Sequence, residues 1–127
     1  MLKAQIRKRL GELSLSIDLS VAKGITVLRG ESGSGKTTIA NLLSGALKPD
    51  EGEIELEGRS VFSTARSINL APEARGIGFV FQTARLLPHL SVEENIRFPQ
   101  TAGRRRPRVD FAEVVEILGL ERLLHRH

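Results

Sequence analysis

The sequence predicts an α/β fold, in which an antiparallel β subdomain leads into a strand, a glycine-rich loop and a helix. Three patterns support this prediction. Apolar and polar residues alternate over residues 13–20, as in a strand with one face on a core and the other in water. A short apolar run at residues 25–28 precedes the glycine-rich loop, as expected of a buried strand. After residue 82 the spacing of apolar residues becomes that of helices.

Length and composition predict one soluble globular domain. The chain has 127 residues, 40% of them hydrophobic and 27% charged, and it contains no cysteine. One ordinary core fits within this length. No apolar run approaches the ~20 residues of a membrane helix, and the first residues lack a signal-peptide core, so we expect neither a membrane span nor secretion. The lack of cysteine excludes a disulfide scaffold, a thiolate metal site and a cysteine nucleophile.

The first part of the chain is expected to form three strands and a helix. Residues 2–6 and 13–20 are predicted to be neighbouring antiparallel strands, because apolar side chains alternate in both. Residues 25–28 are β-branched and apolar on both faces, which predicts a strand buried in a parallel sheet. Residues 37–44 are expected to form a helix that packs on this sheet, and Gly45 can supply its left-handed stop.

The middle of the chain is expected to add two strands separated by a loop. A turn at residues 49–52 leads into a half-exposed strand at residues 53–57, in which glutamates flank two apolar residues. Residues 63–75 show no clear period and are expected to form a loop. Residues 77–81 are expected to form a second buried strand.

The last part of the chain carries helix signals. Ser91 and Glu94 match a capping box and predict a short helix to about Arg97. Asp110 and Glu113 repeat this pattern before an apolar stripe with helical spacing. The sequence therefore predicts a second helix, which a glycine stops.

The glycine-rich loop matches the phosphate-binding pattern of Gly, four residues, then Gly-Lys-Ser/Thr. Glycines let successive backbone N–H groups point inward around a phosphate, and the helix that follows adds the positive end of its dipole. Lys36 can supply a charge to the β- and γ-phosphates, and the Thr37 hydroxyl can ligate Mg²⁺. A flexible turn with a surface lysine is the alternative, but it does not require the flanking strand and helix patterns. The predicted nucleotide-binding residues are Gly30, Glu31, Ser32, Gly33, Ser34, Gly35, Lys36, Thr37 and Thr38.

The motifs together resemble those of a known family. Residues 30–38, 42–45 and 49–58 closely resemble the corresponding motifs of ABC-transporter ATPase subunits, which have a P-loop NTPase core. Residues 72–82 and 84–96 are similar to the Q-loop segment of importer ATPases. Within these, the sequence is most similar to the molybdate-importer ATPase, with the sulfate, iron and polyamine importers as close alternatives.

This resemblance implies a function and a division of the chain. The implied function is that of an importer's ATP-binding subunit, for molybdate or a similar oxyanion, which couples ATP binding and hydrolysis to transport. Residues 1–82 would form the β subdomain and P-loop core, and residues 83–127 the Q-loop and the start of a helical subdomain. The chain would thus be truncated, covering only the first half of such an ATPase domain.

The resemblance also implies ligands and partners. ATP and Mg²⁺ would be the cofactors, with Thr37 and Gln82 as metal ligands, because a neutral amide oxygen can bind a hard cation. Gln82 and residues 83–100 would contact the transmembrane permease, and a second ATPase subunit would complete the site. The location implied is the cytoplasmic side of the membrane, at the permease.

Four parts of the family pattern are absent from the sequence. The five phenylalanines all follow the glycine-rich loop and there is no Tyr or Trp, so Arg9 is a candidate to lie on the base. Asp18, Asp50 and Asp110 do not end an apolar run, so the acidic pair needed for hydrolysis is missing. The signature loop and the switch histidine are missing too. We therefore expect this chain alone to bind Mg-ATP weakly without hydrolysis, and to associate readily.

Two other functions are possible alternatives for this sequence. The net charge of +4 includes a basic run at residues 103–108, which could bind nucleic acid or anionic lipid. The run lacks interleaved aromatic residues, and Asp110, Glu113 and Glu116 follow it, so no nucleic acid is expected as a partner. An independent kinase-like P-loop enzyme would need a catalytic acid that the sequence does not offer.

Overall fold

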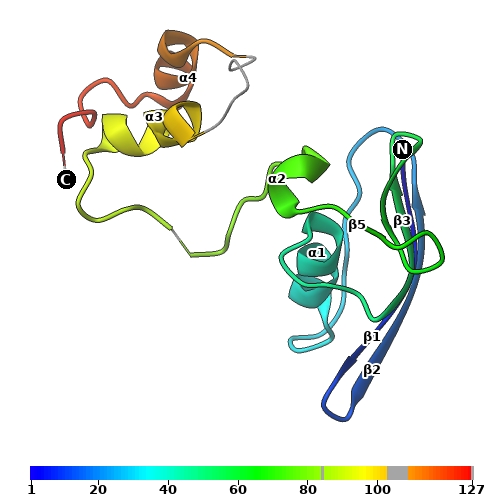
Figure 1. Ribbon diagram of the computed structural model, residues 1–127. Helices are drawn as coiled ribbons and strands as arrows, with labels where there is room; N and C mark the ends of the chain where they lie inside the picture. The colour runs from blue at the N-terminus through cyan, green and yellow to red at the C-terminus, as the bar shows by residue number, and fades with distance from the viewer. Residues whose placement is uncertain (84, 103–108, 127) are drawn as a thin grey trace. The chain divides into compact units, whose positions relative to one another are not determined.

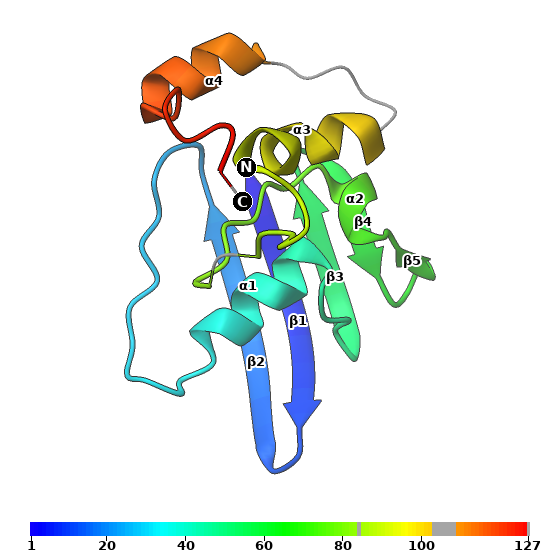
Figure 2. The same ribbon diagram turned by 90° about the vertical axis from the view of Figure 1, so that its left-hand side faces the viewer.

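The computed structural model describes residues 1–83, 85–102 and 109–126. They fold into two compact units, Met1–Phe79 and Val80–His127. Figures 1 and 2 together label their helices and strands. In chain order these are β1 (Leu2–Leu10), β2 (Leu13–Val21), α1 (Lys36–Ser44), β3 (Glu51–Leu56), β4 (Arg59–Ser63), β5 (Ile68–Asn69), α2 (Pro72–Arg75), α3 (Val92–Ala102) and α4 (Phe111–Leu118).

The first unit is an antiparallel sheet with the strand order β2-β1-β3-β4-β5. The predicted pairing of the first two strands is confirmed, and it extends from Leu2 opposite Val21 to Leu10 opposite Leu13. β3 pairs with the other edge of β1 and begins at Glu51, within the turn expected at residues 49–52. β1 therefore has a hydrogen-bonded neighbour on each edge, β2 on one and β3 on the other.

Helix α1 covers one face of this sheet, as Figure 2 shows. The predicted helix is confirmed, and Gly45 ends it in the left-handed conformation with a φ of 88°. Alternation along β1 points Ala4 and Ile6 toward the helix, where Leu42 is fully buried. The buried residues of this core are Ala4, Ile6, Leu42, Ile54, Val61 and Phe62.

The prediction that residues 63–75 form a loop is largely wrong. The structure has the hairpin strand β4, the two-residue strand β5 and the short helix α2 in and just before this region. Glu57 and Gly58 both have positive φ, as in the two-residue turns that join hairpin strands. These elements are too short to show a sequence period, and pairing with β3 is what makes β4 a strand.

The two buried strands expected at residues 25–28 and 77–81 are also wrong. Neither segment is a strand, and Ile25, Val27 and Val80 expose 97%, 70% and 97% of their surface. An all-apolar strand needs hydrogen-bonded neighbours and a cover on both faces. No described segment pairs with either run, so the part of the chain that the structure describes contains only antiparallel pairing.

In the second unit, the capping box at the start of α3 is confirmed. The Ser91 N–H donates to Oε2 of Glu94 at 2.7 Å, and the Glu94 N–H donates to Oγ of Ser91 at 3.3 Å. These bonds satisfy N–H groups that have no partner in the first turn of the helix. The helix extends beyond Arg97, to Ala102.

The capping box predicted at the start of α4 does not form its side-chain hydrogen bond. Asp110 is the N-cap residue, but its side chain makes no capping hydrogen bond. The helix itself is confirmed, and Gly119 ends it with a φ of 62°. The Arg97 guanidinium lies 3.7 Å from the centre of the Phe111 ring, which joins α3 to α4. Among the described helices, none has the length and apolar character needed to cross a membrane.

Candidate functional site

The glycine-rich loop lies at the N-terminal end of α1, in the first unit. Gly33 and Gly35 have φ values of 80° and 91°, which L side chains rarely adopt. The Ile39 N–H donates to the carbonyl of Gly35 at 2.9 Å, and this is the first bond one turn into the helix. Among the described residues, no backbone carbonyl accepts from the N–H groups of Lys36, Thr37 and Thr38, so these groups are available to an anion.

The Lys36 ammonium is held inside this loop. Its Nζ donates to the carbonyl oxygens of Gly30 and Glu31 at 2.9 and 2.5 Å, and contacts Oγ of Ser34 at 3.4 Å. All three partners are neutral oxygens, so the positive charge of the ammonium is not cancelled by a carboxylate. The loop therefore combines a fixed cation with the N-terminus of a helix, which suits it to bind phosphate.

A magnesium ion at this loop would depend on few protein ligands. Thr37 is exposed one residue after Lys36, in the first turn of α1. Within residues 1–83, 85–102 and 109–126, no group of three acidic, His or Cys side chains could hold a metal. A hard cation bound here would therefore take the Thr37 hydroxyl together with phosphate and water oxygens.

The β1–β2 hairpin supports the loop from one side. A Cβ on Gly35 would lie 3.1 Å from Cδ2 of Leu15, so glycine also allows close packing of the loop on β2. Leu15 lies opposite Lys8 in the sheet. The Lys8 side chain is only 16% exposed, and its Nζ is 2.6 Å from Oδ1 of Asp50. This ion pair fixes the end of β1 next to the phosphate loop.

The pKa of the Asp50 carboxyl is lowered. The main cause is the hydrogen bond from Lys8, followed by the bond from the backbone N–H of Arg9, 2.8 Å from Oδ2. A lowered folded pKa means that the charged form of Asp50 stabilises the fold above the unfolded pKa of about 3.9. This contribution is lost as the pH falls through that value and then through the folded pKa.

We therefore expect Asp50→Asn to be less stable than the wild type at pH 7, with a difference that shrinks as the pH falls below about 4. Urea unfolding at pH 7, 5, 4 and 3 would measure it. Asp18→Asn is the matched control, because the Asp18 carboxylate bonds to the neutral Gln5 amide at 3.2 Å on the exposed sheet face. A stability difference between Asp50→Asn and the wild type that stays constant from pH 7 to 3 would contradict the assignment.

Arg9 does not lie where a base-stacking group is needed. Alternation along β1 places Arg9 on the sheet face opposite α1, with Gln5 and Arg7. Its Nε donates to the carbonyl of Gly11 at 3.3 Å, in the turn of the hairpin. The structure therefore does not support the hypothesis that Arg9 lies on the base.

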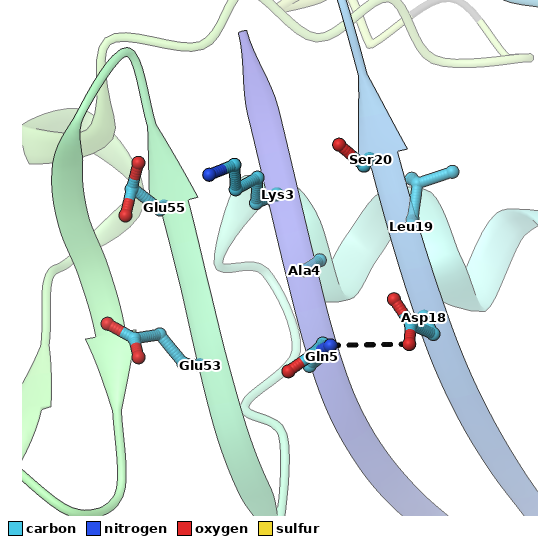
Figure 3. A pocket seen from close by; sticks show the side chains of 8 residues that line it. All are labelled: Lys3, Ala4, Gln5, Asp18, Leu19, Ser20, Glu53 and Glu55. Atoms are coloured by element: carbon cyan, nitrogen blue, oxygen red, sulfur yellow. Dashed lines mark hydrogen bonds between the residues drawn. The ribbon is translucent and has the colours of Figure 1, made fainter.

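A pocket of about 210 Å³ lies on that same outer face, away from the phosphate loop. Figure 3 shows its side chains in front of the strands, with α1 behind the sheet. Basic and polar groups of β1, such as Lys3 and Gln5, lie there between acidic groups of the two neighbouring strands. Mixed charges that pair across strands are typical of a solvated sheet face.

Gln82 belongs to the second unit and is exposed. It lies in a segment without regular secondary structure, as do residue 83 and residues 85–91. Asn95 of α3 holds this segment, because its side chain accepts from the N–H of Leu87 at 2.8 Å and donates to the carbonyls of Leu87 and Leu90 at 3.1 Å. The basic run at residues 103–108 lies outside the described residues.

Two features of the site had no signal in the sequence. Asp50 and Arg75 lie in the segments 49–58 and 72–82, but nothing in those segments indicates that Asp50 pairs with Lys8 or that the buried Arg75 binds the far end of α1. Both join residues more than 30 positions apart. Only the folded chain reveals such pairs.

Comparison with known proteins identifies the family. The model of the ABC transporter family matches residues 14–127. A molybdenum import ATP-binding protein, ModC, of Paramagnetospirillum magneticum is 46% identical over 99% of this chain and 35% of its own length. ModC of Vibrio cholerae is 48% identical over 97% of this chain and 33% of its own. The chain thus spans about a third of the length of these relatives.

Solved structures show the same relationship. The ATP-binding cassette MJ0796, in a dimer bound to ADP and phosphate, matches 98% of this chain and 60% of its own, with a TM-score of 0.71 and 28% identity. The cassette MJ1267 of an ABC transporter matches 98% of this chain and 56% of its own, with a TM-score of 0.73 and 27% identity. This chain therefore has part of the ABC cassette fold and belongs to the ABC transporter family.

Proposed function

We propose that this chain is part of the ATP-binding subunit of an importer for molybdate or a similar oxyanion, and that residues 30–38 bind the phosphates of Mg-ATP. The observation that carries the proposal is the Lys36 ammonium, which two carbonyls hold inside a glycine loop at the start of α1. The names of the ModC relatives support the choice of transported ion.

Different groups of this chain would bind different parts of Mg-ATP. Backbone N–H groups of the loop and of the first turn of α1 would donate to phosphate oxygens. Lys36 would neutralise charge on the β- and γ-phosphates, since each of its present partners is neutral. Thr37, and Gln82 from the second unit, would supply neutral oxygens to Mg²⁺, which holds the triphosphate in one geometry when bound.

The positions of the three aspartates support binding of Mg-ATP without hydrolysis. Asp18 accepts a bond from Gln5, and Asp50 accepts from Lys8 and Arg9. Asp110 is the N-cap residue of α4. None of the three follows an apolar strand, where a carboxylate could hold the metal and polarise the attacking water. We therefore propose that this chain alone binds Mg-ATP weakly and does not hydrolyse it.

The division of the chain and its partners belong to the same proposal. Residues 1–82 would be the β subdomain and P-loop core, and residues 83–127 the Q-loop and the start of the helical subdomain. Along the chain, the boundary between the two compact units falls nearby, after Phe79. Gln82 and residues 83–100 would contact a transmembrane permease, and a second ATPase subunit would complete the nucleotide site. This arrangement would place the chain on the cytoplasmic side of the membrane.

The dependence of affinity on the phosphate chain tests this proposal. We expect Mg-ATP and Mg-ADP to displace a fluorescent ATP analogue from this chain at similar concentrations, and AMP to be weaker by about 100-fold, or about 2.7 kcal/mol. The reason is that Lys36 and the loop act on the β- and γ-phosphates, which AMP lacks. Equal displacement by AMP, or displacement by random DNA, would contradict phosphate-chain binding at this loop.

A further inference from the structure

Arg75 is a buried cation with only neutral partners among the described residues. It is 6% exposed, and burial lowers the pKa of its guanidinium, which nevertheless stays charged. Its Nη1 donates to the carbonyls of Leu42 and Leu43 at 3.1 and 2.9 Å. Its Nε donates to the carbonyl of Leu70 at 3.0 Å, and its Nη2 to Oδ1 of Asn69 at 3.2 Å. One guanidinium therefore joins three segments of the first unit.

Two of these acceptors belong to the last turn of α1. The last carbonyls of a helix have no partner within the helix and carry its negative dipole end, so a buried cation there is stabilising. A Cβ on Gly45 would lie 2.6 Å from Nε of Arg75, which shows how closely the guanidinium packs on the end of the helix. The Leu70 N–H donates to the carbonyl of Val61 at 2.9 Å, so the same contact reaches the buried strand β4. Arg75 thus fastens the C-terminal end of α1 to the sheet.

The other end of α1 carries the phosphate loop. Lys36 is the first residue of this helix, which has nine residues and is about 13 Å long. A hydrogen-bonded helix of this length moves as one body, so a change of direction at its C-terminal end displaces Lys36 and Thr37. Displacements of about 1 Å are enough to weaken a pre-organised site.

We infer that Arg75 is a positioning residue for the glycine-rich loop: by fastening the C-terminal end of α1 to α2 and to the backbone of Leu70, it sets the direction of the helix and hence the place of Lys36 and Thr37. This inference rests on the proposed binding of Mg-ATP at residues 30–38. Coupling between two sites is reciprocal, so bound nucleotide strengthens the contact of Arg75 as much as that contact strengthens binding.

Binding of Mg-ATP and hydrogen exchange, measured on the full chain, test this inference together. Arg75→Gln removes the cation and is expected to weaken Mg-ATP binding about tenfold, while Arg75→Lys, which keeps the charge but not the fork of donors, loses less. Asn69→Ala is the matched control, because it removes the Nη2 partner and leaves the α1 carbonyls bound. We expect it to bind within about twofold of the wild type.

Hydrogen exchange distinguishes positioning from a merely structural role. In the wild type and in Asn69→Ala, saturating Mg-ATP is expected to slow exchange in residues 68–76 about fivefold or more, although the phosphate loop is at the other end of α1. In Arg75→Gln this slowing is expected to be lost, while the amides of β1 remain protected and show that the variant is folded.

The outcomes distinguish a failure of the positioning role of Arg75 from a failure of the proposed binding of Mg-ATP. A folded Arg75→Gln with the affinity and the nucleotide-dependent protection of the wild type would overturn the positioning role and leave the proposed function intact. If Arg75→Gln does not fold, Arg75→Lys is read by the same criteria, and unfolding of both variants would show that Arg75 is structural only. If the wild type does not bind Mg-ATP, or Lys36→Ala binds it equally well, the proposed function fails and this inference fails with it.

Discussion

Gly52→Ala is expected to destabilise the first unit by about 3 kcal/mol or more, from roughly 1–3 kcal/mol of backbone strain and a similar cost of overpacking. Gly52 has a φ of 110° and lies in β3, where it pairs with Ile6 of β1. A Cβ here would overlap the carbonyl oxygen of Gln5 and lie 2.7 Å from Cα of Ile6. Both atoms are backbone atoms of β1, which has a strand on each side, so no side-chain rotation can relieve the overlap.

Gly58→Ala is the matched control for this prediction. Gly58 also has a positive φ, of 81°, but a Cβ there would meet no atom within 4 Å. We expect it to cost about 1 kcal/mol, from strain alone. Urea unfolding followed by far-UV circular dichroism suits both variants, because the chain has no Trp or Tyr to report by fluorescence. Equal losses in the two variants would mean that crowding between β1 and β3 is not the cause.

Lys36→Ala is expected to weaken Mg-ATP binding by about 100-fold or more, which corresponds to about 2.7 kcal/mol. The ammonium lies inside the loop and donates only to neutral oxygens, so its full charge acts on the phosphates. Titration with a fluorescent ATP analogue would measure the effect. The free energy of unfolding is expected to change by no more than about 1 kcal/mol, because the hydrogen bonds that the ammonium makes are exposed to solvent and water can replace them.

Lys48→Ala controls for the loss of a positive charge. Lys48 is exposed and follows α1 at the end away from the loop, so its removal changes the net charge by the same amount. We expect the affinity of this variant to stay within about twofold of the wild type at physiological salt, where screening acts beyond about 8 Å. Similar losses in Lys36→Ala and Lys48→Ala would indicate general electrostatic attraction rather than a phosphate site.

Local chemistry explains which predictions from the sequence are confirmed. Alternation over residues 13–20 needed only one neighbour, β1, and the two strands pair along their full length. Gly45 and Gly119 end their helices because glycine takes a left-handed conformation without strain. The Ser91 capping box depends on residues three positions apart, and it forms as the pattern indicates. The glycine-rich loop before α1 likewise follows from spacing, because its glycines and Lys36 are neighbours in the chain.

Most of the wrong predictions required distant partners; the capping box at Asp110 is the local exception. Residues 25–28 and 77–81 have the composition of buried strands, but a strand is stabilised by hydrogen bonds to other strands, and no described segment supplies them. Strands β4 and β5 show the reverse case, since they have little pattern of their own and exist because β3 and β4 pair with them. The hypothesis that Arg9 lies on the base of the nucleotide also depends on the tertiary structure, because it requires knowing which face of β1 the side chain occupies.

Four features could be predicted from the sequence alone: the glycine-rich loop, the helix that follows it, the first hairpin and the capped start of α3. Each of them depends on residues close together in the chain. The tertiary structure alone decided which apolar segments become strands and where Arg9 points. It also revealed the contacts that place the loop, made by Lys8, Asp50 and Arg75. The physical reason is that hydrogen bonds and ion pairs between residues far apart in the chain are set by packing, which leaves no spacing pattern in the sequence.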